Sequence, residues 1–187
     1  YFAKELNRAG YAVYANDHRG HGLTAPNRES VGYISHGDGF NDMVRDMYEL
    51  NNYIKGEKPS LPIILFGHSM GSFLSQRFIQ LYGDEIKGVI FSGSNGKQSP
   101  IINLGIFIAY IEMKVRGRKH RSKILDKLTL GGYNNAFKPN RTNFDWLSRD
   151  EEQVDIYVAD PYCGGVFTSS FFYDFLIFVA IKLSWLK

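Results

Sequence analysis

The sequence contains a single cysteine, Cys163, among its 187 residues. One thiol cannot close an internal disulfide, so a disulfide-stabilised scaffold is excluded and a cytoplasmic location is expected. The sequence also has little excess of one sign of charge. Its 22 Lys and Arg residues are nearly balanced by 19 Asp and Glu residues, which gives a formal net charge of +3. Such a small positive net charge does not predict the concentrated positive surface of a nucleic-acid-binding protein, so we expect no nucleic-acid partner.

Long hydrophobic runs are few as well. The chain does not begin with Met, and residues 1–6 lack the apolar core of a secretory signal. The most apolar stretch, Phe171 to Leu186, is interrupted by Asp174 and Lys182 and is short for a membrane span. We therefore expect a buried helix, or a helix of a cap, in this stretch. Hydrophobic residues make up 44% of the chain, which is enough for the core of one globular domain.

The first hundred residues alternate between helix and strand patterns. Apolar residues recur at helical spacing over residues 1–8, 38–55 and 70–83. Between them, β-rich or uninterrupted apolar runs occupy residues 11–15, 63–66 and 87–93. An apolar run without alternation is typical of a parallel strand that is covered on both faces. The order predicts an α/β fold with a doubly wound, mostly parallel sheet.

From residue 100 onward the patterns are mainly helical. Loops are expected near residues 131–132 and 161–165, where glycine and proline interrupt the helical spacing. A capping box, Ser-Arg-Asp-Glu at residues 148–151, predicts the start of one of these helices. The change from alternating patterns to helices predicts a boundary near residue 100.

The strongest chemical signal is a Gly-x-Ser-x-Gly motif, Gly-His-Ser-Met-Gly at residues 67–71. A chance match in such a chain has a probability of roughly one in ten, but this motif lies between a predicted buried strand and a predicted helix. That context is the nucleophile elbow, in which a sharp turn holds a serine in a strained conformation with its hydroxyl exposed. The pattern predicts Ser69 as a nucleophile; the alternative is a tight turn whose serine only caps the helix.

The neighbours of Ser69 have separate expected roles. Gly67 and Gly71 flank the turn, where backbone segments approach closely and a side chain would not fit. The backbone N–H of Met70, at the start of the helix, can face the oxygen that becomes negative during attack, which predicts one donor of the oxyanion hole. Adjacent residues in a sharp turn point apart, so we interpret His68 as packing of the elbow and not as the base.

A second motif joins the elbow in a resemblance to a known family. Residues 67–71, preceded by Asp-His-Arg-Gly-His-Gly-Leu-Thr at residues 17–24, resemble the monoacylglycerol lipase and lysophospholipase group of α/β-hydrolases, the serine aminopeptidase S33 or "hydrolase 4" family. The similarity extends over residues 39–55, and residues 144–175 resemble the cap of bacterial lysophospholipase-like members. Ser72 and Thr24 depart from the family, where glycine and serine are common at these positions.

This resemblance implies how the chain is divided. Residues 1–99 would form a partial α/β-hydrolase core that carries the elbow, and residues 100–187 a mainly helical cap or lid. The loop at residues 17–24 would lie beside the site without taking part in catalysis, so we interpret Asp17, Arg19 and His21 as structural.

The remaining members of a catalytic triad are not found. Hydrolases of this fold order the triad as Ser, then Asp or Glu, then His. His120 is the one histidine after Ser69, and the basic run from Lys114 to Arg121 around it disfavours the imidazolium that a base must form. The resemblance places the acid and base after the cap and the first oxyanion donor before residue 1. We therefore expect an internal fragment of a longer enzyme; the rival interpretation is an intact non-catalytic homologue.

Together these features predict a serine hydrolase that cleaves small amphipathic esters, monoacylglycerol or lysophospholipid, through an acyl-enzyme on Ser69 and without a metal or cofactor. A peptidase or amidase with the same machinery and a non-catalytic binding protein are the alternatives. The basic run at residues 114–121 predicts a transient contact with a membrane surface or a solvated face. An acyl-binding cap over Ser69, or the core of the cap itself, is predicted for the apolar residues 101–113, Phe167, Phe171, Phe172 and Phe175.

Overall fold

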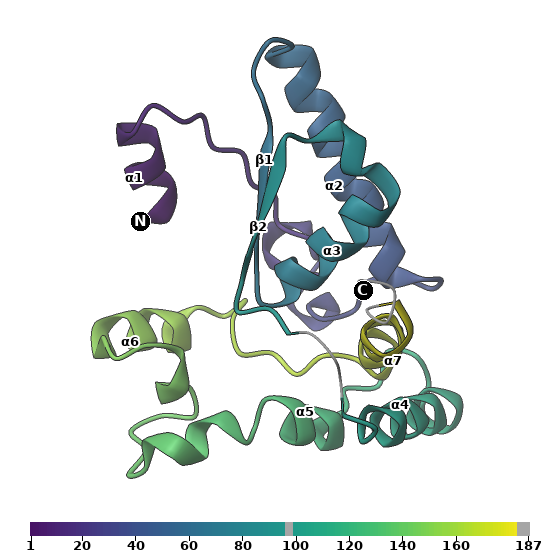
Figure 1. Cartoon of the computed structure of the whole chain (residues 1–187). Helices are drawn as coiled ribbons and strands as arrows, with labels where there is room; N and C mark the ends of the chain where they lie inside the picture. Colours follow the sequence, from purple (N-terminus) through teal and green to yellow (C-terminus); the bar gives the residue numbers. More distant parts are fainter. Residues whose placement is uncertain (96–98, 183–187) are drawn as a thin grey trace.

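A two-stranded parallel sheet lies at the centre of the chain (Figure 1). The computed structural model describes residues 1–95 and 99–182. Strand β1 (Ile64–His68) pairs with β2 (Gly88–Ser92), and the register runs from Ile64 opposite Gly88 to His68 opposite Ser92. Helix α3 (Met70–Tyr82) and a 3-10 helix (Gly83–Glu85) connect the two strands. The predicted strand, helix and strand around residue 69 are confirmed, and with them the α/β class.

Helix α2 (Gly39–Glu57) packs with α3 on one side of the sheet (Figure 1). It begins where the Asp38 carboxylate accepts a hydrogen bond from a backbone N–H of the first turn, as an N-cap residue does. Its apolar residues recur at helical spacing, so Phe40, Met43 and Val44 share one side and are buried in the same cluster as Leu74 of α3. This packing fixes α3, and with it the serine that precedes the helix.

The chain beyond residue 100 is mainly helical, as predicted. Helices α4 (Ile102–Arg116), α5 (Lys123–Thr129), α6 (Glu151–Ala159) and α7 (Ser169–Ile177) lie below the sheet in Figure 1. Helix α6 begins at Asp150, whose carboxylate accepts from the backbone N–H groups of Glu152 and Gln153. The predicted capping box at residues 148–151 is therefore wrong in detail, because the aspartate and not Ser148 caps the helix.

Short helices fill the remaining connections. They are α1 (Phe2–Arg8), the 3-10 helices Gly22–Thr24, Arg28–Ser30, Tyr133–Phe137 and Asp145–Leu147, and a π-helical turn at Phe178–Lys182. Helix α1 matches the helix predicted over residues 1–8.

Helix α7 belongs to the main hydrophobic cluster. Phe171, Phe172 and Leu176 are buried with residues of α2 and α3, and the rings of Phe171 and Phe175 stack at 5.8 Å. The cluster therefore joins elements on both sides of the boundary expected near residue 100. The expectation that Phe171 and Phe172 close a separate core of the cap is wrong, because both are buried in this shared cluster. No helix within residues 1–95 and 99–182 is long and apolar enough to span a membrane.

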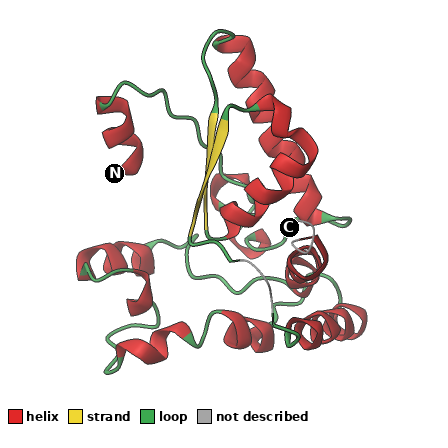
Figure 2. Cartoon of the chain, in the orientation of Figure 1, coloured by secondary structure: helices red, strands yellow, loops and turns green. Residues whose placement is uncertain are grey.

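The strand predicted over residues 11–15 does not form. Figure 2 shows this segment as a loop, and the Tyr11 backbone N–H bonds to the Leu6 carbonyl at the end of α1. A strand needs a neighbour that accepts its backbone hydrogen bonds, and no strand in the described part of the chain pairs with these residues. The β-rich composition alone was a misleading signal.

The expectation that both strands are covered on both faces is also wrong for the structure described. Leu65 and Gly67 of β1 face the helices, whereas Ile64 and Phe66 are 49% and 44% exposed on the opposite face. Ile90, the register partner of Phe66, is 53% exposed. The ring of Phe2 in α1 contacts Phe66 at 5.0 Å on this side. An uninterrupted apolar run thus predicted the strand correctly but not its surroundings.

Candidate active site

Ser69 connects β1 to α3 in a strained backbone conformation. Its φ and ψ angles are 52° and −119°, and it is the one residue other than glycine with a positive φ among the described residues. Two backbone hydrogen bonds hold this turn: the Ser69 N–H donates to the Ser92 carbonyl and the Ser72 N–H donates to the Ser69 carbonyl, each at 2.9 Å. The side chain is exposed at the end of the sheet. Strain and exposure together are the features of a nucleophile elbow.

The two glycines of the motif have different roles in this turn. A Cβ added to Gly67 would lie 2.7 Å from the Gly71 carbonyl carbon and still closer to its oxygen, so β1 and α3 can approach only without a side chain. A Cβ added to Gly71 would meet no atom within 4 Å. The expectation that both positions exclude a side chain is therefore wrong for Gly71. Its carbonyl lies close to Gly67, but the space beside its own Cα is open.

The His68 side chain contacts the end of β2, the neighbouring strand. Its Nδ1 lies 3.0 Å from the Ser92 Oγ at the end of β2. Gly93, with φ of 56°, passes so close that an added Cβ would lie 3.1 Å from the His68 Cε1. The structure thus places His68 against Ser92 and Gly93, and its interpretation as packing of the elbow stays a prediction.

Met70 provides the first backbone N–H of α3. The first N–H groups of a helix have no partner within the helix, and the Met70 N–H makes no hydrogen bond to any described residue. It lies directly after the exposed serine, at the positive end of the helix dipole, where a developing oxyanion would be stabilised.

No base is brought to Ser69 by the described residues. The ring of His120, the one histidine after the elbow, lies with its Nε2 3.2 Å from the Arg116 Nη1 and 3.6 Å from the Glu112 Oε1. In the parts of the chain that the structure covers, no hydrogen bond or ion pair joins the Ser69 side chain to an acid or base. Those residues also contain no group of three or more His, Cys, Asp or Glu residues that could hold a metal ion.

The comparisons with known proteins agree with this geometry. The profile of the hydrolase-4 family, described as serine aminopeptidase S33, matches residues 1–181. The chain belongs to this family. It is 30% identical over 159 residues to a monoacylglycerol lipase of Mycolicibacterium smegmatis and to a monoglyceride lipase of Rattus norvegicus, matches that cover 85% of this chain. These matches cover 49% and 45% of the two relatives, so the chain spans about half their length.

Solved structures show the same fold. A carboxyl esterase from Bacillus coagulans in complex with glycerol superimposes with a TM-score of 0.81 and 26% identity, over 96% of this chain and 58% of the esterase. A monoacylglycerol lipase from Paleococcus ferrophilus superimposes with a TM-score of 0.62 and 20% identity, over 95% of this chain and 58% of that lipase. The hydrolase-4 chain is thus a partial α/β-hydrolase fold that resembles the monoacylglycerol lipases.

The family's second motif, at residues 17–24, makes structural contacts in this hydrolase-4 chain. The Arg19 guanidinium binds both carboxylate oxygens of Asp46 in α2, with its Nε at 2.7 Å and its Nη2 at 2.5 Å. The Asp17 carboxylate accepts from the Leu23 backbone N–H at 2.9 Å, and the ring of His21 lies 5.5 Å from that of Phe167. Burial lowers the pKa of His18 in the same loop. These contacts tie the loop to α2 and to the segment that precedes α7.

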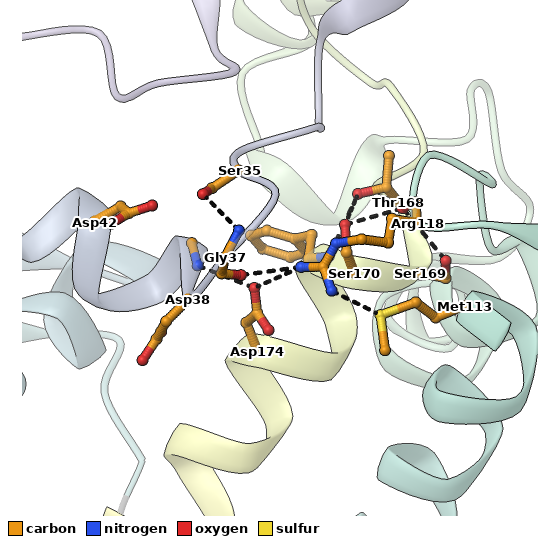
Figure 3. A network of polar contacts seen from close by, with 12 residues as sticks. Ser35, Gly37, Asp38, Asp42, Met113, Arg118, Thr168, Ser169, Ser170 and Asp174 are labelled. Carbon is orange, nitrogen blue, oxygen red and sulfur yellow. Dashed lines mark hydrogen bonds and ion pairs between the residues drawn. The ribbon is translucent and has the colours of Figure 1, made fainter.

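A polar network attaches α7 to the start of α2 (Figure 3). The Asp174 Oδ2 accepts from the Gly39 backbone N–H at 3.0 Å and lies 3.9 Å from the Arg118 guanidinium. The same guanidinium donates to the Gly37 carbonyl at 2.9 Å. Burial raises the pKa of Asp174 to about 6, although the Gly39 N–H and the charge of Arg118 act in the opposite direction. The network thus joins α7 to the start of α2 through groups that lie up to 135 positions apart in sequence.

Sequence reasoning missed Ser92 and Gly93, which close the elbow from the neighbouring strand. The carboxyl ends of parallel strands meet at one edge of a sheet, so the pairing of the two predicted strands already places residues 92–93 beside residues 68–69. The network of Arg118 and Asp174 had no comparable signal, because nothing local relates those residues to Gly37 and Gly39.

Proposed function

We propose that this chain supplies the nucleophile of a serine hydrolase that cleaves carboxylic esters of lipids, of the monoacylglycerol lipase and lysophospholipase type. The observation that carries the proposal is the conformation of Ser69, strained, exposed and followed by an unpaired helix N–H. A serine that merely capped α3 would accept a hydrogen bond from the first turn through its side chain, and Ser69 makes no such bond.

In this mechanism the Ser69 Oγ attacks the ester carbonyl carbon, and its proton passes to a general base. The carbonyl oxygen becomes negative and accepts a hydrogen bond from the Met70 N–H. Collapse of the tetrahedral intermediate breaks the bond to the alcohol, which leaves with a proton, and an acyl group remains on Ser69. Water then attacks the acyl carbon and releases the fatty acid. We place the base and the acid in polypeptide outside residues 1–187, because no described residue brings either to Ser69, and the family resemblance places the other oxyanion donor there as well.

The lipid substrate is supported by the names of the relatives. Both curated relatives are lipases of monoacylglycerols, and the esterase with the TM-score of 0.81 was solved with glycerol. An amidase or peptidase would use the same elbow, so ester hydrolysis and amide hydrolysis must be distinguished by measuring the activity on each type of substrate. We expect the polypeptide encoded by the complete gene to release fatty acid from a monoacylglycerol at least about tenfold faster than it cleaves an aminoacyl amide, whose leaving group is poorer. The reverse preference would assign a peptidase.

We also propose that α4 contacts the lipid surface that carries the substrate. Leu104, Phe107, Ile111 and Val115 recur at helical spacing and are exposed, and the last of them lies within the basic run at residues 114–121. Binding to vesicles that contain anionic lipid should fall several-fold in Phe107→Ser because the apolar face is lost. The matched variant Phe137→Ser, at another exposed phenylalanine, should bind as the wild type does. Equal losses in the two variants would contradict this contact.

A further inference from the structure

A second concave site shares no residue with the elbow. It is a pocket of about 370 Å³, open to solvent, between the short helix Arg28–Ser30, the start of α5 and the loop at residues 161–166. This volume falls within the range of about 300 to 1,000 Å³ that small-molecule sites occupy. We call this site the basic cavity. It is lined by Arg28, Glu29, Val31, Arg121, Lys123, Pro161, Tyr162, Gly165 and Val166.

Arg121 holds two walls of the basic cavity together. Its Nη1 donates to the Val166 carbonyl and its Nη2 donates to the Glu29 carbonyl, each at 2.6 Å. Both acceptors are neutral, so the guanidinium is positioned without a carboxylate to balance its charge. The two walls lie 92 and 45 positions from Arg121 in sequence, which makes this arginine a long-range fixing point of the cavity.

The other two cations of the basic cavity also lack a carboxylate partner. Arg28 lies with its guanidinium carbon 5.9 Å from the centroid of the Tyr162 ring, a neutral surface. No ion pair of Arg28 or Lys123 occurs among the residues that the structure describes. Arg19 and Arg141, in contrast, each pair with carboxylates.

The balance of charge and surface indicates the ligand. Three cations line the basic cavity against the one carboxylate of Glu29, which leaves an excess of two positive charges. A concave site with an excess of one sign of charge concentrates counter-ions, and apolar lining residues such as Val31 and Val166 provide low-dielectric surface that focuses the field. A group with several acceptor oxygens can bind Arg and Lys donors at the same time, which a single carboxylate does less well.

We propose that the basic cavity binds a phosphate group, with Arg28 and Lys123 as donors and Arg121 as a fixed positive charge. The group can be free phosphate or the phosphodiester headgroup of a lipid, because both present negatively charged non-bridging phosphoryl oxygens that Arg and Lys donors can bind. This site is independent of ester hydrolysis at Ser69.

The test is a titration of the 187-residue chain with inorganic phosphate at low ionic strength, followed by NMR of its backbone amides. We expect saturable shifts at residues 28–31, 121–123 and 161–166. Lys123→Gln and Arg28→Gln should each weaken binding about tenfold, since each removes one charged donor. The control Lys58→Gln removes an exposed charge at the end of α2 and should bind phosphate as the wild type does.

A parallel titration with glycerophosphoglycerol, a lipid headgroup without acyl chains, separates the two sources of the phosphate. Tighter binding of the diester assigns a lipid headgroup, and tighter binding of inorganic phosphate assigns the free ion. Shifts that do not saturate, or an equal loss of affinity in Lys58→Gln, would overturn the basic cavity as a site. Circular dichroism on each variant shows that the chain is folded, and two independent variants guard against a local defect in either one.

Discussion

The elbow and the attachment of α7 are built from different kinds of contact. Ser69 is positioned by backbone groups no more than 23 residues away, through its hydrogen bond to Ser92 and the close approach of Gly67 to Gly71. Helix α7 is attached through side chains, with Asp174 bound to Gly39 across 135 positions and Thr168 bound to Gly32 across 136. The elbow depends on backbone hydrogen bonds and close packing, which contain no titratable group, so its geometry should not respond to pH. The attachment of α7 depends on a buried carboxyl group and should respond to pH.

The largest effect is expected where sterics fix the elbow. Gly67→Ala places a methyl group against the Gly71 carbonyl and should lower the free energy of unfolding by about 3 kcal/mol, because backbone must move. Gly71→Ala is the matched control in the same motif, where an added methyl meets open space inside a helix. It should be neutral or stabilising by up to about 1 kcal/mol. Urea denaturation measures both, and equal losses would show that the steric requirement is not specific to Gly67.

The strain at Ser69 predicts a gain of stability when it is relieved. Glycine adopts a positive φ without a Cβ penalty, so Ser69→Gly should be more stable than Ser69→Ala by about 1.5 kcal/mol. Both variants lack the hydroxyl, so the difference reports the relief of the strained conformation, reduced by the larger backbone entropy that glycine loses on folding. Thermal unfolding of the pair makes the comparison, and an alanine variant as stable as the glycine variant would argue against a strained serine.

A smaller effect is expected from pH at the attachment of α7. The pKa of Asp174 is raised to about 6 in the folded chain, above the ordinary value of 3.8, so the folded form binds the proton more tightly between these two values. Stability should therefore decrease as the pH rises from about 4 to 6 and then level off. We expect Asp174 to contribute about 1 kcal/mol to this decrease in the free energy of unfolding, because part of its carboxyl group faces solvent.

Asp174→Asn removes the titrating group and should flatten this dependence. Asp84→Asn, at an exposed aspartate, is the matched control and should keep the slope of the wild type. Urea denaturation at several pH values gives both slopes. A slope that Asp174→Asn leaves unchanged would show that another group is responsible.

The elbow was predictable from the sequence because its determinants are local. A five-residue motif between an apolar run and a helical pattern predicts Ser69, and the structure has the strand and the helix in those places. The strand expected over residues 11–15 failed because strand formation depends on a partner, which composition does not reveal. The exposed face at Ile64 and Phe66 was missed for the same reason, since burial is a property of the neighbours. Arg118 and Asp174 meet only through the tertiary packing of α7 on α2.

The central claim is that Ser69 is the nucleophile, and labelling with a fluorophosphonate probe tests it most directly. The probe forms a covalent bond with an activated serine and should label the polypeptide encoded by the complete gene. Ser69→Ala should abolish that label. Ser72→Ala, at the serine whose hydroxyl donates a hydrogen bond to the Ser69 carbonyl, should retain it. Residues 1–187 alone should show little or no labelling or turnover, because none of the residues that the structure describes brings a base to Ser69. Labelling that survives Ser69→Ala, or no labelling of the complete polypeptide, would contradict the account.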